Sequence, residues 1–128
     1  MDNLTFNGTK WIGGKILMNP RQGERDSQKI GIAGPPIETK HGWLLIYHGI
    51  SKKPDHHYHL RAALLDIKDP TKVIARTHDP ILEPEMQYEY EGLVSHVVFS
   101  CGTVVKNDLL FIYYGGADKV IGVATAKL

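Results

Sequence analysis

The chain has one cysteine, almost no net charge and no long hydrophobic run, and each absence excludes a class of protein. Cys101 alone cannot build a disulfide framework, so a reducing compartment, the cytoplasm, is the simple expectation. A net charge of +1 over 128 residues gives no electrostatic basis for binding nucleic acid or an anionic membrane. No stretch approaches the ~18 apolar residues of a membrane span, and the first residues do not resemble a signal peptide. We therefore expect an ordinary cytoplasmic globule without nucleic-acid or membrane partners.

Helical periodicity is also missing, because no stretch of 12 or more residues repeats its apolar positions every 3.6 residues. Instead, 13 glycines and 7 prolines divide the chain into short runs rich in Val, Ile, Leu and Tyr, which are typical of β-strands. After an irregular lead-in over 1–33, we expect strands at about 35–39, 43–49, 58–66, 73–76, 97–106, 109–114 and 119–126. The segment Lys106-Asn107-Asp108 predicts a tight hairpin turn between two of them.

One strand motif occurs twice in the sequence. GWLLIYHG begins at Gly42, and DLLFIYYG begins at Asp108. Each copy lies between two other strand-like runs, which is the pattern of β-propeller blades. We therefore predict an all-β propeller domain of about two blades, over 34–80 and 94–128. Propellers typically have 4–8 blades, so we also expect either a homo-oligomer or a missing N-terminal half.

Several longer motifs carry a family resemblance. DSQKIGIAGPPIETKHGWLLIYHGI, AALLDIKDPTKVIART and VVFSCGTVVKNDLLFIYYGGADKVIGVATAKL resemble, in this order, the C-terminal part of glycoside hydrolase family 130. The resemblance implies a five-bladed propeller that needs no cofactor. It further implies that inorganic phosphate, the co-substrate, cleaves a terminal β-mannosyl unit and gives mannose 1-phosphate. The family's catalytic acid is an aspartate in an N-terminal segment without a counterpart here, so the catalytic residue is unknown and the isolated chain is expected to be inactive.

Three residues at the tips of expected strands could supply donors to a phosphate ion. Lys29 offers a cation, His48 an imidazole and Tyr58 a phenol, and each matches a phosphate-binding position of the family. A protonated His48 would strengthen the binding. Each residue could instead be structural or solvated, and His59 is a rival for the role of Tyr58. Asp118 matches a position that holds the mannosyl ring in the family, so we expect it to bind the sugar; the alternative is a turn aspartate.

Other polar clusters are weaker candidates. Asp55-His56-His57-Tyr58-His59 could attract a metal ion, but adjacent strand residues point to opposite faces, so we expect no metal site. The acidic stretch from Glu83 to Glu91 is expected to be a solvated loop, and Cys101 a buried structural thiol. Four residues depart from the family pattern: Arg25, Arg61, His96 and Ser100, the last of which stands where a proline is common.

Two other functions stay open at this point. The first is a β-mannosidase, which would use water in place of phosphate. The second is a non-catalytic fragment that binds sugars or anions or associates with itself.

Overall fold

The computed structural model describes residues 5–6, 8, 11–12, 14–52 and 56–128. It contains a two-stranded ribbon, two larger antiparallel sheets and one short helix. In chain order the elements are β1 (Thr5–Phe6), β2 (Trp11–Ile12), β3 (Lys29–Ile32), β4 (Ile37–Thr39), β5 (Gly42–Ile50), β6 (His59–Leu65), β7 (Val73–Arg76), α1 (Gln87–Tyr90), β8 (Val98–Lys106), β9 (Leu109–Gly116) and β10 (Val120–Lys127).

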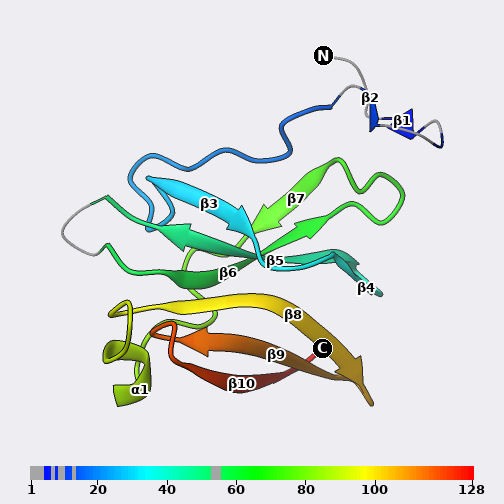
Figure 1. The fold of residues 1–128 in the computed structure, drawn as a ribbon. Helices are drawn as coiled ribbons and strands as arrows, with labels where there is room; N and C mark the ends of the chain where they lie inside the picture. Colours follow the sequence, from blue (N-terminus) through cyan, green and yellow to red (C-terminus); the bar gives the residue numbers. More distant parts are fainter. Residues whose placement is uncertain (1–4, 7, 9–10, 13, 53–55) are drawn as a thin grey trace.

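The two larger sheets form separate layers (Figure 1). The first sheet has the order β3-β5-β6-β7, with β4 paired to a second segment of β5. The second sheet has the order β10-β9-β8, so β8 is an edge strand. The all-β prediction is therefore confirmed, and its expected strands are all present. The division into propeller blades stays a prediction.

The repeated motif forms β5 and β9, the strands that hold each sheet together. Both strands pair on two sides and are therefore central in their sheets. A buried cluster between the sheets joins the first sheet to Leu110 and Ile112 of β9. A second cluster, around Leu45 and Tyr47, covers the other face of the first sheet.

The predicted hairpin turn between β8 and β9 is confirmed. Lys106 pairs with Leu109, and the two residues between them, Asn107 and Asp108, have positive φ values of 52° and 58°. Two consecutive left-handed residues define the type I′ turn that fits the twist of paired strands, and Asn and Asp tolerate this conformation better than most residues.

The lead-in over 1–33 was expected to be irregular, yet it contains β3. Lys29–Ile32 pairs with Tyr47–Ile50 of β5, and its burial pattern does not alternate clearly. Lys29–Ile32 is therefore a strand because of its backbone hydrogen bonds to β5. The sequence of this segment gives no sign of that pairing, because the partner strand lies further along the chain.

The expectation of a buried thiol at Cys101 was wrong, because the Cys101 side chain is exposed. A β-bulge explains the difference: Ser100 pairs with Tyr114 and Gly102 with Tyr113, so Cys101 has no partner residue on β9. An extra residue of this kind shifts the alternation of inward and outward side chains.

The acidic stretch was expected to be solvated, but Glu89 in α1 is only 2% exposed. Its carboxylate accepts hydrogen bonds from the backbone N–H groups of Glu85 (2.7 Å) and Met86 (2.9 Å) and from the hydroxyl of Tyr114 (2.6 Å). Burial alone would raise the pKa of Glu89, but these donors stabilise the anion and hold its pKa below the usual value. Glu89 therefore attaches α1 to β9.

Replacing Tyr114 with phenylalanine should lower the free energy of unfolding by about 1.5–3 kcal/mol, since it removes a hydrogen bond to a charged, buried acceptor. Urea denaturation measures this effect. Tyr113→Phe is the matched control: that side chain, next along β9, is 47% exposed, so its hydroxyl should matter by less than about 0.5 kcal/mol. Equal losses from the two variants would contradict the role of Glu89.

In the part of the chain that the structure describes, no helix is both long and apolar enough to span a membrane.

Candidate functional site

A cavity of about 130 Å³ brings together the three predicted phosphate-binding residues. Lys29 comes from β3, His48 from β5 and Tyr58 from the segment before β6. Phe99 of β8 and the backbone around Gly31 complete the wall. The cavity therefore lies where an edge of the first sheet meets the second sheet.

Lys29 and Tyr58 form the polar part of this cavity. The Lys29 ammonium donates a hydrogen bond to the Tyr58 hydroxyl over 3.3 Å. Tyr58 is fixed by a parallel bridge to Val97 and by an edge-on contact of its ring with Phe99, with centroids 5.8 Å apart. Its rival His59 is 1% exposed and is not among the cavity residues, because neighbouring residues on a strand face opposite ways.

His48 is the buried member of the group, with 3% of its surface exposed. Its Nε2 accepts a hydrogen bond of 2.9 Å from the backbone N–H of Ser100, and its ring stacks on Phe99 at 3.8 Å between centroids. Burial lowers the pKa of His48 below its usual value, and the charge of Lys29 lowers it further. Near neutral pH this ring is therefore uncharged, and the stronger phosphate binding predicted for a protonated His48 would require a pH below the usual histidine pKa.

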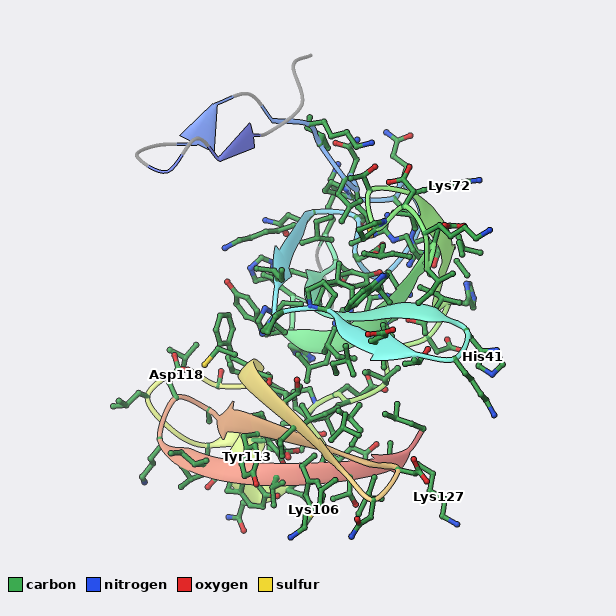
Figure 2. All side chains as sticks on the ribbon, turned by 90° about the vertical axis from the view of Figure 1, so that its right-hand side faces the viewer. His41, Lys72, Lys106, Tyr113, Asp118 and Lys127 are labelled. Atoms are coloured by element: carbon green, nitrogen blue, oxygen red, sulfur yellow. The ribbon has the colours of Figure 1, made fainter. Side chains whose placement is uncertain are left out.

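Asp118 lies in the turn between β9 and β10 and does not line this cavity. Ala117 and Asp118 both have positive φ, and the Asp118 side chain is exposed at the end of the second sheet (Figure 2). The backbone N–H of Ala117 donates to Val97, the residue that bridges to Tyr58. The turn with Asp118 therefore belongs to the same end of the molecule as the cavity.

A buried ionic cluster, which the sequence analysis missed, lies beside this site. Asp26 is fully buried and accepts hydrogen bonds from Arg21 Nη2 (3.0 Å), Arg76 Nη2 (2.8 Å) and the Tyr47 hydroxyl (2.9 Å). Arg61 Nε lies 3.7 Å from the same carboxylate. Burial alone would raise the pKa of Asp26, but the donors, Arg21 foremost, hold it below its usual value.

Arg61 is the one signal in the sequence that could have revealed this cluster. It stands within the apolar run of β6, and a fully buried guanidinium requires a carboxylate near it. Its Nη2 donates to the backbone carbonyl groups of Thr77 and His78, while its Nε and Nη1 have no hydrogen-bond partner among the described residues.

Gly49, which ends the first copy of the repeat, makes room for this cluster. A Cβ atom there would lie 2.8 Å from His59 Nε2, 2.9 Å from Asp26 Cβ and 3.1 Å from Arg61 Cδ. The glycine is therefore required by the close approach of three side chains to the β5 backbone.

The histidine cluster is dispersed by the fold. Asp55 lies outside the described residues. The His57 ring stacks on His96, with centroids 4.3 Å apart, while His59 is turned into the protein.

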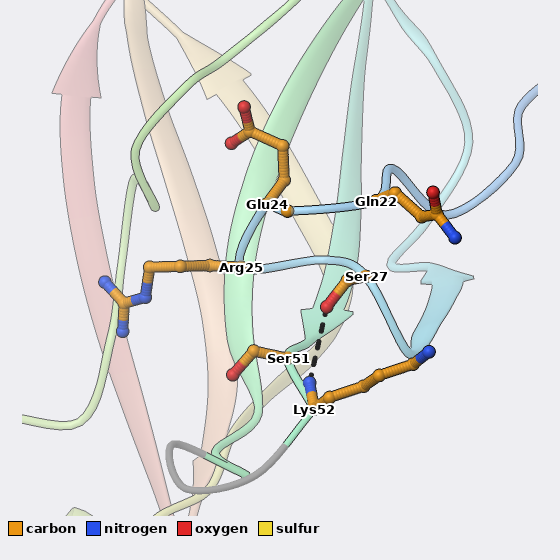
Figure 3. Close-up of a pocket in the computed structure, with 7 residues that line it drawn as sticks. Gln22, Glu24, Arg25, Ser27, Ser51 and Lys52 are labelled. Carbon is orange, nitrogen blue, oxygen red and sulfur yellow. Dashed lines mark hydrogen bonds between the residues drawn. The ribbon is translucent and has the colours of Figure 1, made fainter.

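A larger cavity of about 380 Å³ lies nearby, lined by Gln22, Gly23, Glu24, Arg25, Ser27, Ser51 and Lys52. Its two cationic side chains extend in different directions, and the marked hydrogen bond joins the Ser27 hydroxyl to the Lys52 backbone N–H (Figure 3). Arg25 is paired with Glu83 at 2.5 Å. These cations do not converge on one point, so the smaller cavity is the better candidate site.

The fold and the smaller cavity define an all-β protein whose candidate site offers an ammonium and a phenol at one point. Comparison with known families gives the particular class: the profile of the β-1,4-mannooligosaccharide phosphorylases, glycoside hydrolase family 130, matches residues 2–128. The chain belongs to this family.

Two relatives of known sequence are named as phosphorylases of β-1,2-linked mannosides. The chain is 57% identical over 110 residues to a β-1,2-mannobiose phosphorylase of Thermoanaerobacter sp. (strain X514), covering 86% of this chain and 36% of the relative. It is 51% identical over 118 residues to a 1,2-β-oligomannan phosphorylase of the same strain, covering 92% of this chain and 39% of the relative. The chain thus spans less than two fifths of the length of these relatives.

Solved structures agree with the sequence comparison. The Listeria innocua β-1,2-mannobiose phosphorylase, in complex with β-1,2-mannobiose, matches with a TM-score of 0.81 and 44% identity over 87% of this chain and 31% of its own. A structure from work on family 130 hydrolases that target β-1,2 mannosidic linkages in Candida mannan matches with a TM-score of 0.82 and 32% identity, over 91% of this chain and 37% of its own.

Proposed function

We propose that this chain is part of a β-mannoside phosphorylase, which uses inorganic phosphate to cleave terminal β-mannosyl linkages and releases mannose 1-phosphate. The observation that carries the proposal is the Lys29–Tyr58 pair, whose two polar atoms lie 3.3 Å apart at a small cavity. An ammonium and a hydroxyl at this spacing can each donate to a different oxygen of one phosphate ion.

The proposed reaction needs three kinds of group. Lys29 and Tyr58 hold the phosphate, one of whose oxygens forms a bond to the anomeric carbon of the mannosyl unit. Asp118 accepts hydrogen bonds from sugar hydroxyls. A proton donor must protonate the oxygen of the departing sugar as the glycosidic bond breaks, and this contribution is typically 10²–10⁴-fold in rate. Our proposal assigns that donor to no residue of this chain, so the chain by itself is expected to be inactive.

The names of the relatives support a β-1,2 linkage for the substrate. Both Thermoanaerobacter phosphorylases and the Listeria enzyme are named for β-1,2-linked mannosides, and they are 44–57% identical to this chain. A β-1,4-mannooligosaccharide phosphorylase of Ruminococcus albus is 40% identical. We therefore propose β-1,2-mannosides as the substrate class.

Hydrolysis is the second candidate function, because one structural neighbour comes from work on family 130 glycoside hydrolases. A hydrolase transfers the mannosyl unit to water and has no need of a phosphate site. The Lys29–Tyr58 pair therefore favours phosphorolysis, and phosphate binding separates the two functions.

Replacing Lys29 with alanine should weaken the binding of inorganic phosphate about tenfold or more, because a hydrogen bond from a charged donor contributes ~1.5–3 kcal/mol. Isothermal titration calorimetry or phosphorus NMR with the chain measures the dissociation constant.

Lys106→Ala is the matched control for this experiment, since it removes the same charge. Lys106 ends β8, seven residues beyond Phe99, which is about 23 Å along a strand. Arg76, on the edge strand β7, also lies outside the cavity, but it is unsuitable as a control because its guanidinium pairs with the buried Asp26. Equal losses from the two lysine variants would reduce the proposed site to a nonspecific charge effect, and no phosphate binding by the unmodified chain would favour hydrolysis.

We propose that 34–80 and 94–128 are successive blades of a propeller in a cytoplasmic enzyme. Further blades, from the same protein or from a second copy of the chain, would cover the open sheet edges.

A further inference from the structure

The edge of β8 points its backbone donors at the first sheet. Among the described residues, β8 pairs in its sheet with β9 alone, so alternate N–H groups on its other side have no strand partner there. Val98 N–H donates to the Tyr58 carbonyl over 3.3 Å, and Ser100 N–H donates to His48 Nε2 over 2.9 Å. Ser100 and His48 are both buried, so water does not compete for this bond.

This contact determines the tautomer of His48. A backbone N–H can only donate, so Nε2 must present its lone pair and cannot carry a proton. The proton of the neutral ring therefore lies on Nδ1. His48 pairs with Gly31 in the sheet and hydrogen-bonds its backbone, and a Cβ built on Gly31 would lie 4.0 Å from Nδ1. Both ring nitrogens are thus engaged with the protein.

The surroundings of His48 also oppose a second proton. Three side chains surround the ring: the charged Lys29 of β3, Tyr58 in a T-shaped contact from the segment before β6, and the stacked Phe99 of β8. An added proton on Nε2 would meet the N–H of Ser100. None of these neighbours is an anion that could compensate it.

Ser100 is held in place by its own side chain. Its hydroxyl donates to the Tyr113 carbonyl over 2.7 Å, across the β-bulge. The bulge orients the Ser100 backbone, and that backbone in turn orients the imidazole.

We propose that the backbone N–H of Ser100 is a positioning group for the candidate phosphate site. It engages Nε2 and so fixes His48 as the Nδ1–H tautomer, while the Gly31 backbone engages Nδ1, so that Lys29 and Tyr58 are the groups left to contact the anion. Only the statement about Lys29 and Tyr58 rests on the proposed function, because the tautomer of His48 can be measured without any ligand.

The test is nitrogen-15 NMR of the histidine rings, recorded between pH 7 and 5. The His48 signals are those that disappear in His48→Gln. We expect the neutral ring to be the Nδ1–H tautomer, and we expect it to gain its second proton only below the usual histidine pKa of about 6.5. An Nε2–H tautomer, or an imidazolium that forms near pH 6.5, overturns the proposal whether or not phosphate binds.

Two substitutions at one position isolate the backbone donor. Ser100→Ala removes the hydroxyl and keeps the N–H, so the Nδ1–H tautomer should persist. Ser100→Pro removes the N–H as well, so His48 should populate the Nε2–H form and its pKa should rise toward 6.5. An unchanged tautomer in folded Ser100→Pro overturns the proposal. If that variant does not fold, the spectra of the unmodified chain and of Ser100→Ala decide.

Inorganic phosphate separates this inference from the proposed function. Phosphate should change the signals of Lys29 and Tyr58 and leave the His48 tautomer as it was. Conversion of His48 to an Nε2–H donor or an imidazolium on phosphate addition overturns its positioning role. A chain that binds no phosphate contradicts the proposed function, while the tautomer measured without ligand still tests the assignment of Ser100.

Discussion

Asp26→Asn is expected to lower the free energy of unfolding by about 3–5 kcal/mol, the loss typical when one partner of a buried ion pair is removed. The substitution keeps the size of the side chain but removes the charge that compensates three guanidinium groups. Of these, Arg61 is fully buried, and Arg21 and Arg76 both hydrogen-bond Asp26 directly. Typical total stabilities are about 5–15 kcal/mol, so this loss would remove a large part of the total and would bring a domain at the low end of that range close to unfolding at room temperature.

Urea denaturation followed by circular dichroism measures this loss. The matched control is Asp108→Asn, at the exposed hairpin turn with φ of 58°, where asparagine is as well tolerated as aspartate. That variant should stay within about 0.5 kcal/mol of the unmodified chain. A similarly small effect of Asp26→Asn would show that the cluster does not stabilise the fold.

The second large effect is a loss of stability between pH 6.5 and pH 4. Burial, assisted by the charges of Arg25 and Arg61, lowers the pKa of His59 to about 4. In the unfolded chain a histidine titrates near 6.5, so between these values the unfolded state binds a proton that the folded state does not. The contribution is therefore fully present above pH 6.5 and is lost as the pH falls toward 4, by about 2–3 kcal/mol at pH 4.5.

Two other groups add to the acid response with the same sign. The pKa of His48 is also lowered by burial, so its contribution disappears over part of the same range. The pKa of Asp26 lies below its usual value, so its contribution is lost only at still lower pH.

Urea denaturation at pH 7 and pH 4.5 tests the role of His59. In His59→Gln, which cannot gain a charge, the difference between the two pH values should shrink by most of that amount. His41→Gln serves as the control, because His41 is exposed on the turn between β4 and β5 (Figure 2). An unchanged difference in His59→Gln would show that another group causes the acid sensitivity.

Strand positions were predictable because their signals are local. Short runs rich in apolar residues, glycines and the Asn107-Asp108 turn specify β5, β8 and β9 within a few residues of their ends. β3 was missed for the opposite reason: its short, partly exposed segment becomes a strand only by pairing with β5.

For the candidate site, the sequence indicated which residues meet but not their states. Lys29, His48 and Tyr58 do line one cavity, as their places at strand tips and the family resemblance led us to expect. That His48 is buried and uncharged follows from β8, a strand 50 residues further along the chain.

By itself, the sequence determined the all-β class, the repeated strand and hairpin and the family, because these depend on residues close together in the chain and on their order. Only the tertiary structure decided the roles of Asp26, Glu89 and His59. Burial and charge state depend on groups brought from distant segments, such as Arg76 to Asp26 and Tyr114 to Glu89. The sequence around a carboxylate in a polar stretch does not show whether the folded protein exposes it to water or buries it among arginines. Its pKa and its contribution to stability therefore depend on the tertiary structure around it.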